Sequence, residues 1–211
     1  MRHHSSYRAA AATHQFRERG LSPASVLLIC MGNICRPPNA DGIFRDRLAK
    51  AGLSGLVEID SAGTHSYHIG HAPDARTQAA AERRGYDLSA LRARRVEASD
   101  FERFEWIVAM DNANVSELTA RSLTAFGHKI VRLMDFARRH DATEVPDPCY
   151  GGAQGFETVL TACSCVWDRP TDRLSARTSS WGNGVCVAIG DEIALRVDAP
   201  NRAIIRPSLT G

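Results

Sequence analysis

The stretch that decides the fold occupies positions 26–38 and reads Val26-Leu27-Leu28-Ile29-Cys30-Met31-Gly32-Asn33-Ile34-Cys35-Arg36-Pro37-Pro38. Its four leading apolar residues predict a short buried strand, and a helix-like run follows the two prolines as far as Lys50. A tight loop between a strand and a helix start is an anion site, because unpaired N–H groups and the helix dipole both attract negative charge. Successive amides of such a loop form a concave nest for a phosphate-sized group. The stretch therefore predicts that a phosphate binds between Cys30 and Arg36.

Cys30 and Arg36 bring two reactive groups to this expected phosphate site. The planar fork of an arginine grips two phosphate oxygens, and Gly32 permits backbone angles that other residues resist. A positive cradle lowers the pKa of a thiol and yields a thiolate at neutral pH. Since a thiolate beneath a bound phosphate is a nucleophile aimed at phosphorus, we expect Cys30 to attack a phosphoester.

Composition and charge exclude several classes of function. The 211 residues suffice for one sizeable domain, and 26 Lys+Arg against 24 Asp+Glu leave a net charge of only +2, which gives no basic field for nucleic acid. No apolar run approaches the roughly 20 residues of a membrane helix, so no membrane insertion is expected. The six cysteines lack paired Cys-x2-Cys spacing, so we expect no metal and no cofactor. A free nucleophilic thiol fits a reducing, cytoplasmic location.

Strand-like apolar segments alternate with helix-length connections along the chain. They lie at 26–29, 57–60, 106–110 and 129–133. This β-α-β-α-β-α-β order predicts an α/β fold, a three-layer sandwich with a four-stranded parallel sheet and helices on both faces. In such sheets ligands bind beyond the carboxyl ends of the strands, which is where Cys30, Ser61 and Asp111 are expected.

The string Cys-Met-Gly-Asn-Ile-Cys-Arg-x-Pro resembles the active-site loop of the low-molecular-weight protein tyrosine phosphatases. The segments Asp60-Ser61-Ala62-Gly63-Thr64 and Asp147-Pro148-Cys149-Tyr150 extend the resemblance. It implies hydrolysis of phosphotyrosine or aryl phosphate monoesters through a phosphocysteine intermediate, with catalytic residues Cys30, Arg36 and Asp147. Cys30 would be the nucleophile and Asp147 the general acid and then base. The implied phosphate-binding residues are Met31, Gly32, Asn33, Ile34, Cys35 and Arg36.

The same resemblance assigns supporting residues and partners. Ser61 is implied to hold Asn33, Tyr67 to face the substrate and Tyr150 to form an aromatic wall beside the site. Cys149 stands where the family frequently has an aromatic residue, which leaves substrate preference open. The implied partner is a phosphotyrosine protein, and for a bacterial source a tyrosine autokinase that controls polysaccharide export.

Two features leave alternatives open. The family has Ser or Thr after the loop arginine, and its hydroxyl helps to hold the thiolate as leaving group, whereas Pro37 has neither hydroxyl nor N–H. We therefore expect an impaired enzyme, and a phosphate-binding module without catalysis is one alternative. An arsenate reductase on the same scaffold is another, although no relay cysteine occurs between Cys35 and Cys149. Cys35 is either a partner for a reversible disulfide with Cys30, as the resemblance implies, or a packed loop cysteine.

The resemblance does not reach either end of the chain. We expect a mobile extension over 1–24, a phosphatase-like domain over 25–165 and a tail of unknown structure over 166–211. After about Thr161 the sequence no longer reads as the amphipathic helix that ends the family's domain, and its loss would uncover an apolar face of the sheet. Within the tail, the stretch Val185 to Val197 has the composition of strands.

Overall fold

The computed structural model describes residues 24–51, 54–55, 57–137, 141–167, 176–177, 185–189 and 193–197. The chain divides into two compact units. One comprises Ser25–Phe44 and Ile59–Val166, and the other comprises Met1–Ala24, Arg45–Glu58 and Trp167–Gly211. All candidate site residues belong to the first unit. The expected N-terminal extension lies outside the described residues, apart from Ala24.

A four-stranded sheet forms the centre of the first unit. Its strands are β1 (Ala24–Cys30), β2 (Val57–Gly63), β3 (Trp106–Ala109) and β4 (Ile130–Arg132), in the order β2-β1-β3-β4. β3 pairs in parallel with β1 and with β4, so that Ile107 is opposite Leu27 on one side and Ile130 on the other. All four strands expected from the sequence are therefore present. Their parallel order follows from the helical connections, because a parallel pair needs a long crossover.

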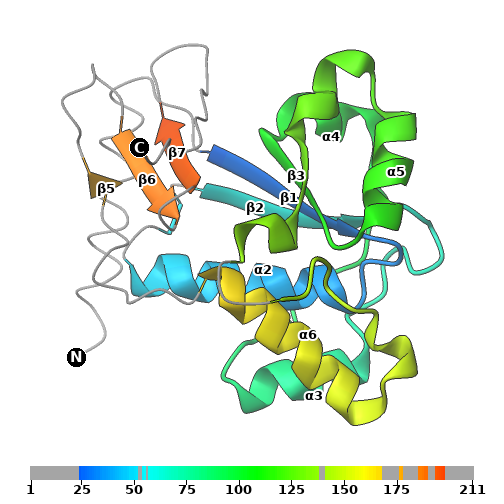
Figure 1. The fold of residues 1–211 in the computed structure, drawn as a ribbon. Helices are drawn as coiled ribbons and strands as arrows, with labels where there is room; N and C mark the ends of the chain where they lie inside the picture. Colours follow the sequence, from blue (N-terminus) through cyan, green and yellow to red (C-terminus); the bar gives the residue numbers. More distant parts are fainter. Residues whose placement is uncertain are drawn as a thin grey trace. The chain divides into compact units, whose positions relative to one another are not determined.

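Helices cover both faces of this sheet. They are α2 (Arg36–Lys50), α3 (Ala75–Arg83), α4 (Ala98–Arg103), α5 (Asn112–Arg121) and α6 (Gly152–Trp167), with 3-10 turns η1 (Thr124–Lys129), η2 (Leu133–Phe136) and η3 (Pro148–Tyr150). Figure 1 shows α4 and α5 on one side of the sheet and α2, α3 and α6 on the other. The predicted three-layer α/β architecture is confirmed.

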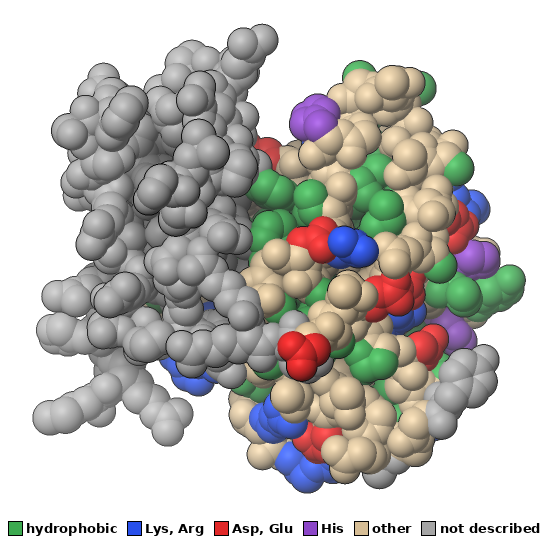
Figure 2. Space-filling view, in the orientation of Figure 1, with side chains coloured by type: hydrophobic (Ala, Val, Ile, Leu, Met, Phe, Trp, Pro, Cys, Tyr) green, Lys and Arg blue, Asp and Glu red, His purple; other side chains and the backbone are tan. Residues whose placement is uncertain are grey.

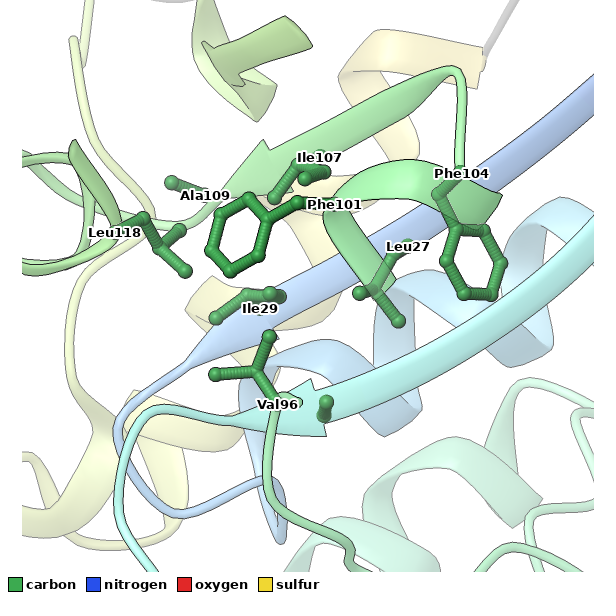
Figure 3. Close-up of a cluster of buried hydrophobic side chains, with 9 residues drawn as sticks. Leu27, Ile29, Val96, Phe101, Phe104, Ile107, Ala109 and Leu118 are labelled. Carbon is green, nitrogen blue, oxygen red and sulfur yellow. The ribbon is translucent and has the colours of Figure 1, made fainter. Parts of the chain in front are cut away.

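One face of the sheet carries a compact apolar core. Alternate residues of β1 and β3 point to this face, as the two-residue period of a strand requires. They pack against aromatic residues in and after α4 and against α5, and Figure 3 shows these side chains gathered around β1 and β3. The buried members are Leu27, Ile29, Ala62, Val96, Phe101, Phe104, Ile107, Ala109 and Leu118. Because a one-residue slip would turn this set outward, the core fixes the register that leaves Cys30 at the end of β1.

The opposite face of the sheet is covered by α2 and α6 (Figure 1). The expectation that the last helix stops near Thr161 is wrong, because α6 runs on to Trp167 and buries Ala162 and Cys163 completely. Small Ala and Cys side chains fit a helix that packs closely, since a free cysteine behaves as a small apolar residue. The sheet face that the sequence reading left uncovered is therefore covered.

An ion-pair cluster joins α3 to α6. The carboxylate of Glu157 accepts a hydrogen bond from Nη2 of Arg83 at 2.7 Å and another from Nη2 of Arg84 at 2.8 Å. Arg84 also donates to the hydroxyl of Thr161 at 3.0 Å. Because each of these exposed pairs alone contributes little, the cluster orients α6 rather than supplying most of its stability.

The segment Ala93–Val96 runs beside the carboxyl end of β2. The N–H of Gly63 donates to the carbonyl of Arg94 at 2.8 Å, and the N–H of Val96 donates to the carbonyl of Gly63 at 2.9 Å. The guanidinium of Arg94 binds the carboxylates of Asp60 and Asp100, at 2.9 and 2.8 Å. Main-chain bonds and ion pairs together hold this segment against the sheet edge.

The described part of the second unit includes a small antiparallel sheet. Its strands are β5 (Ala176–Arg177), β6 (Val185–Ile189) and β7 (Ile193–Val197), in that order. The strand character expected over Val185 to Val197 is confirmed, with Val187 opposite Leu195. Within the described ranges, no helix combines the length and apolarity that crossing a bilayer demands. On the face shown in Figure 2, acidic and basic side chains are interspersed, in keeping with the near-zero net charge.

Candidate active site

The loop after β1 closes around the sulfur of Cys30. The N–H of Asn33 donates to Sγ of Cys30 over 3.3 Å, and the N–H of Gly32 also hydrogen-bonds this sulfur. Both amides therefore point into the loop, as in a nest that holds an anion. α2 begins at Arg36, directly after the loop, but Pro37 and Pro38 have no N–H and the N–H of Asn39 donates to the carbonyl of Cys35 at 3.4 Å. The amide donors of the site therefore come from the loop itself. The remaining predicted phosphate-binding residues, Met31, Ile34 and Cys35, lie in the same loop.

Asn33 fixes the shape of this loop. Its φ of 56° places it in the left-handed region, where Asn is among the tolerated residues. Its buried side chain donates from Nδ2 to the carbonyl of Ser61 at 3.0 Å. The structure thus brings together the two residues that the sequence paired. The serine contributes its main-chain oxygen to this hydrogen bond, and its hydroxyl takes no part in it.

The end of β2 supports the loop from behind. The N–H of Thr64 donates to the carbonyl of Cys30 at 2.8 Å, and the N–H of His65 donates to that of Met31 at 2.9 Å. The two backbones approach so closely at Gly63 that a Cβ there would lie 2.7 Å from the carbonyl oxygen of Met31. Only glycine fits this contact without a shift of the loop.

Arg36 is held by a carboxylate that the sequence reading did not assign to the site. Its Nη1 donates to Oδ2 of Asp111 at 2.5 Å and to the carbonyl of Val145 at 3.2 Å. The other oxygen of Asp111 accepts the N–H of Asn114 at 2.7 Å and so caps α5. The sequence placed Asp111 at the carboxyl edge of the sheet, where ligands bind, but gave it no role toward Arg36. Its position beyond β3, next to β1, was the signal that could have revealed the second role.

Asp147 lies near the other terminal nitrogen of the same guanidinium. Its Oδ2 is 3.8 Å from Nη2 of Arg36, and its Oδ1 accepts the N–H of Cys149 at 3.0 Å. Partial burial favours the neutral acid, but hydrogen bonds from Cys149 and the charge of Arg36 outweigh it and hold the pKa of the Asp147 carboxyl below its ordinary value. Cys30, Arg36 and Asp147, which are far apart in sequence, therefore form one constellation.

Burial raises the pKa of the Cys30 thiol above its ordinary value. The charge of Arg36 and the N–H groups of Asn33 and Gly32 act in the opposite direction without overcoming it, and the charge of Asp111 raises the pKa further. The sequence led us to expect a lowered thiol pKa, and the balance of these effects in the structure is in the opposite direction. The loop removes the thiol of Cys30 from water, and the carboxylate of Asp111 offsets the positive charge of Arg36.

Cys35 is a buried thiol in the same loop. Burial raises its pKa to about 12, while an interaction with the Thr77 side chain acts the other way. Both Cys30 and Cys35 are free thiols in the structure. At neutral pH Cys35 is accordingly protonated and a poor nucleophile.

Exposed apolar side chains occur in the phosphate loop and in the segment after β2, which is hydrogen-bonded to that loop through His65. Met31 and Ile69 are about half exposed, and Tyr67, which the sequence assigned to face the substrate, is 71% exposed and stacks on His65. The ring of His68 lies against Gly32, since a Cβ on that glycine would be 3.0 Å from the ring. The side chain of Tyr150 lies outside the described residues. Across the described ranges, no three His, Cys, Asp or Glu side chains are grouped as a metal site would require.

Comparison with known proteins identifies the family. The family model described as low molecular weight phosphotyrosine protein phosphatase matches residues 25–165. The chain belongs to this family. The low molecular weight protein-tyrosine-phosphatase YfkJ of Bacillus subtilis is 44% identical over 137 residues, which are 64% of this chain and 85% of YfkJ. The human low molecular weight phosphotyrosine protein phosphatase is 36% identical over 140 residues, 66% of this chain and 88% of its own.

Solved structures of low molecular weight phosphatases share the fold. The protein tyrosine phosphatase of Entamoeba histolytica, with Hepes in its active site, matches with a TM-score of 0.65 and 39% identity, over 68% of this chain and 92% of that chain. The structure of YfkJ matches with a TM-score of 0.62 and 39% identity, over 69% of this chain and 92% of YfkJ. The chain is therefore a protein tyrosine phosphatase of the low-molecular-weight type.

Proposed function

We propose that the chain hydrolyses phosphotyrosine or aryl phosphate monoesters through a phosphocysteine intermediate on Cys30. The observation that carries the proposal is the convergence of a thiol, a guanidinium and a carboxyl group beside inward-pointing amides. Cys30 receives N–H groups from the loop, and Arg36 lies within 3.8 Å of Asp147. A nucleophile, an oxyanion clamp and a proton donor are what a two-step phosphoryl transfer needs.

In the first step, the ionised sulfur of Cys30 attacks phosphorus and the bond from phosphorus to the aryl oxygen breaks. Arg36 and the loop amides stabilise the equatorial oxygens, and Asp147 gives its proton to the departing phenoxide. In the second step, the Asp147 carboxylate takes a proton from water as that water attacks phosphorus. The bond between phosphorus and sulfur breaks, which releases inorganic phosphate and returns the thiolate and the protonated acid.

The protonation states set the rate of this reaction. Attack requires an ionised Cys30 together with a protonated Asp147, yet the structure raises the pKa of the thiol and lowers that of the carboxyl. The fraction of molecules that holds both forms at once is small whenever the thiol has the higher pKa. We expect slow turnover because Pro37 lacks the hydroxyl that the family resemblance places after the loop arginine, and the directions of the two pKa shifts agree with this.

The proposal is tested by hydrolysis of p-nitrophenyl phosphate. Cys30→Ser should abolish turnover, and Asp147→Ala should slow it about 10²- to 10⁴-fold, the usual contribution of general acid–base catalysis. Mass spectrometry of Asp147→Ala quenched during turnover should find a phosphoryl group on Cys30. Cys165→Ser, which changes a thiol of α6, serves as the control. Full activity of Cys30→Ser would exclude the mechanism, whereas phosphate binding without turnover in the wild-type chain would favour the non-catalytic module.

The natural substrate that we propose is a phosphotyrosine protein, and for a bacterial source a tyrosine autokinase. Exposed apolar side chains in the phosphate loop and in the segment hydrogen-bonded to it, Met31, Tyr67 and Ile69, support an aromatic phosphoester, because such side chains offer stacking and apolar contact. A reducing, cytoplasmic location fits a mechanism that depends on a free thiol. Release of phosphate from a phosphotyrosine peptide, compared with the matching phosphoserine peptide, tests the substrate class.

A further inference from the structure

Tyr67 belongs to a segment that is held against the phosphate loop on both sides of the tyrosine. Before it, the N–H of His65 donates to the carbonyl of Met31 at 2.9 Å. After it, the ring of His68 lies against Gly32, where a Cβ would be 3.0 Å from Cδ2 of the histidine. Met31 and Gly32 are both residues of the phosphate loop. The backbone of Tyr67 is therefore fixed next to the site at which we propose that a phosphoester binds.

The side chain of Tyr67 is ordered by an aromatic neighbour. The residue is 71% exposed, so the close packing that fixes the side chains of the core does not act on it. Its ring stacks on the imidazole of His65, with the two ring centroids 5.3 Å apart and an angle of 15° between the ring planes. The stack therefore favours one orientation of the tyrosine ring.

The imidazole of His65 is itself held on the side of α5. Its Nδ1 shares a hydrogen bond of 2.9 Å with the hydroxyl of Thr64 and lies 3.7 Å from Oε2 of Glu117. Glu117 is paired within α5 with Arg121, and Nη1 of Arg121 donates to the carbonyl of Thr64 at 2.7 Å. Because a ring nitrogen forms its hydrogen bonds near the plane of the ring, these contacts hold the edge of the imidazole and leave its face to Tyr67.

We infer that His65 is a positioning residue for Tyr67, whose imidazole holds the tyrosine ring ready to contact the aromatic ring of a substrate. The inference rests on the proposed function and on the predicted substrate-facing role of Tyr67. A ring that is already ordered binds with a smaller loss of conformational entropy than one that becomes ordered only on binding. His65 therefore increases the affinity for phosphate monoesters of aromatic alcohols and has little effect on phosphates without a ring.

The test compares p-nitrophenyl phosphate, which carries an aromatic ring, with acetyl phosphate, which carries none. Both have good leaving groups, so neither depends strongly on the general acid. In His65→Ala, we expect KM for p-nitrophenyl phosphate to rise about two- to tenfold with kcat nearly unchanged, since the lost aromatic pair acts on binding and not on the chemical step. The constants for acetyl phosphate should stay close to those of the wild type, which also shows that the phosphate loop is intact.

Three further variants separate the stack from other effects of the substitution. His65→Phe keeps an aromatic face without the hydrogen bond to Thr64, so its KM for p-nitrophenyl phosphate should lie between those of the wild type and His65→Ala. Tyr67→Ala should raise this KM by itself, and adding His65→Ala should raise it no further, because a positioning residue acts only through the residue that it positions. His128→Ala, which removes a histidine of η1, is the control and should change neither substrate's constants.

Four results would overturn the inference and leave the proposed function standing. They are an unchanged KM for p-nitrophenyl phosphate in His65→Ala, equal losses for the two substrates in that variant, a His65→Phe variant as weak as His65→Ala, and a further loss when His65→Ala is added to Tyr67→Ala. An unchanged KM in Tyr67→Ala would remove the substrate-facing role of Tyr67 and the inference with it. The proposed function is tested separately, since full activity of Cys30→Ser overturns it whatever the His65 and Tyr67 variants show.

Discussion

The carboxylate of Asp111 accepts a hydrogen bond at 2.5 Å from the guanidinium of Arg36, the side chain that we propose to bind the phosphate. The pair is largely buried, with 6% of the Arg36 side chain and 18% of the Asp111 side chain exposed. Asp111 orients the arginine and at the same time offsets its charge near Cys30. One residue therefore improves the geometry of the site and reduces the acidity of its thiol.

Replacing Asp111 by Asn should separate these two effects. The amide keeps an oxygen for the cap of α5 but removes the negative charge, so the pKa of the Cys30 thiol should fall and the thiolate should form at lower pH. Turnover should nevertheless decrease, by about 10- to 100-fold, because Arg36 is no longer held in place. The pH midpoint of iodoacetamide inactivation measures the thiol, and kcat measures the geometry. Asp135→Asn, at a surface pair with Arg132, is the control, and an unchanged midpoint in Asp111→Asn would contradict this account.

We expect Asn33→Gly to destabilise the protein less than Asn33→Ala. Asn33→Gly keeps access to a φ of 56° and loses only the hydrogen bond to Ser61, which costs about 1 kcal/mol of unfolding free energy. Asn33→Ala also pays about 1–2 kcal/mol for the left-handed backbone. Urea denaturation should therefore rank the wild type above Asn33→Gly and Asn33→Ala last. Equal stability of the two variants would show that the backbone angle carries no strain.

Gly63→Ala should displace the phosphate loop. The added Cβ would lie 2.7 Å from the carbonyl oxygen of Met31 and 3.2 Å from the carbonyl carbon of Gly32, both main-chain atoms that cannot rotate away. We expect a loss of about 1–3 kcal/mol in unfolding free energy together with weaker phosphate binding. Gly127→Ala, where a Cβ meets nothing within 4 Å, is the matched control. Phosphate affinity measured by calorimetry should fall in the first variant and stay constant in the second.

Pro37→Ser should accelerate the second chemical step. The resemblance to the family implies that a hydroxyl after the loop arginine helps to hold the sulfur as leaving group, and a proline supplies none. A single such donor typically changes a rate by about 10²- to 10³-fold, so kcat should rise clearly and the pre-steady-state burst should shrink. Pro37→Ala removes the ring without adding a hydroxyl and separates the two contributions. No rise in turnover for the serine variant would count against a role for this position.

The strand, loop and helix order was readable from the sequence because each element carries a local signal. The apolar run from Val26 to Ile29 predicts β1, and glycines, prolines and capping residues mark the turns. The end of α6 was not readable in this way. Ala162 and Cys163 are small and only weakly apolar, and what keeps them helical is burial, which only the folded protein shows.

The candidate site was predictable in its members but not in its electrostatics. The family resemblance implied that Cys30, Arg36 and Asp147 act together, and in the structure Arg36 lies near both of the others. The partner of Arg36 and the direction of the thiol's pKa depend on how deeply the loop is buried and on which carboxylate lies nearest. Neither quantity has a signature in a single stretch of sequence. The partner of Arg36 and the pKa of the thiol depend on contacts between segments that are distant along the chain.

The segment Ala93–Val96 has a consequence for how a protein substrate can approach. Its main-chain bonds to Gly63 occupy the free edge of β2 beside the phosphate loop. An extended peptide therefore cannot dock there by adding a strand, the mode in which backbone hydrogen bonds supply affinity. For the proposed phosphotyrosine substrate, we expect recognition to depend on the modified ring in the loop and not on backbone hydrogen bonds at this edge. Affinity should accordingly depend little on the sequence around the phosphorylated residue.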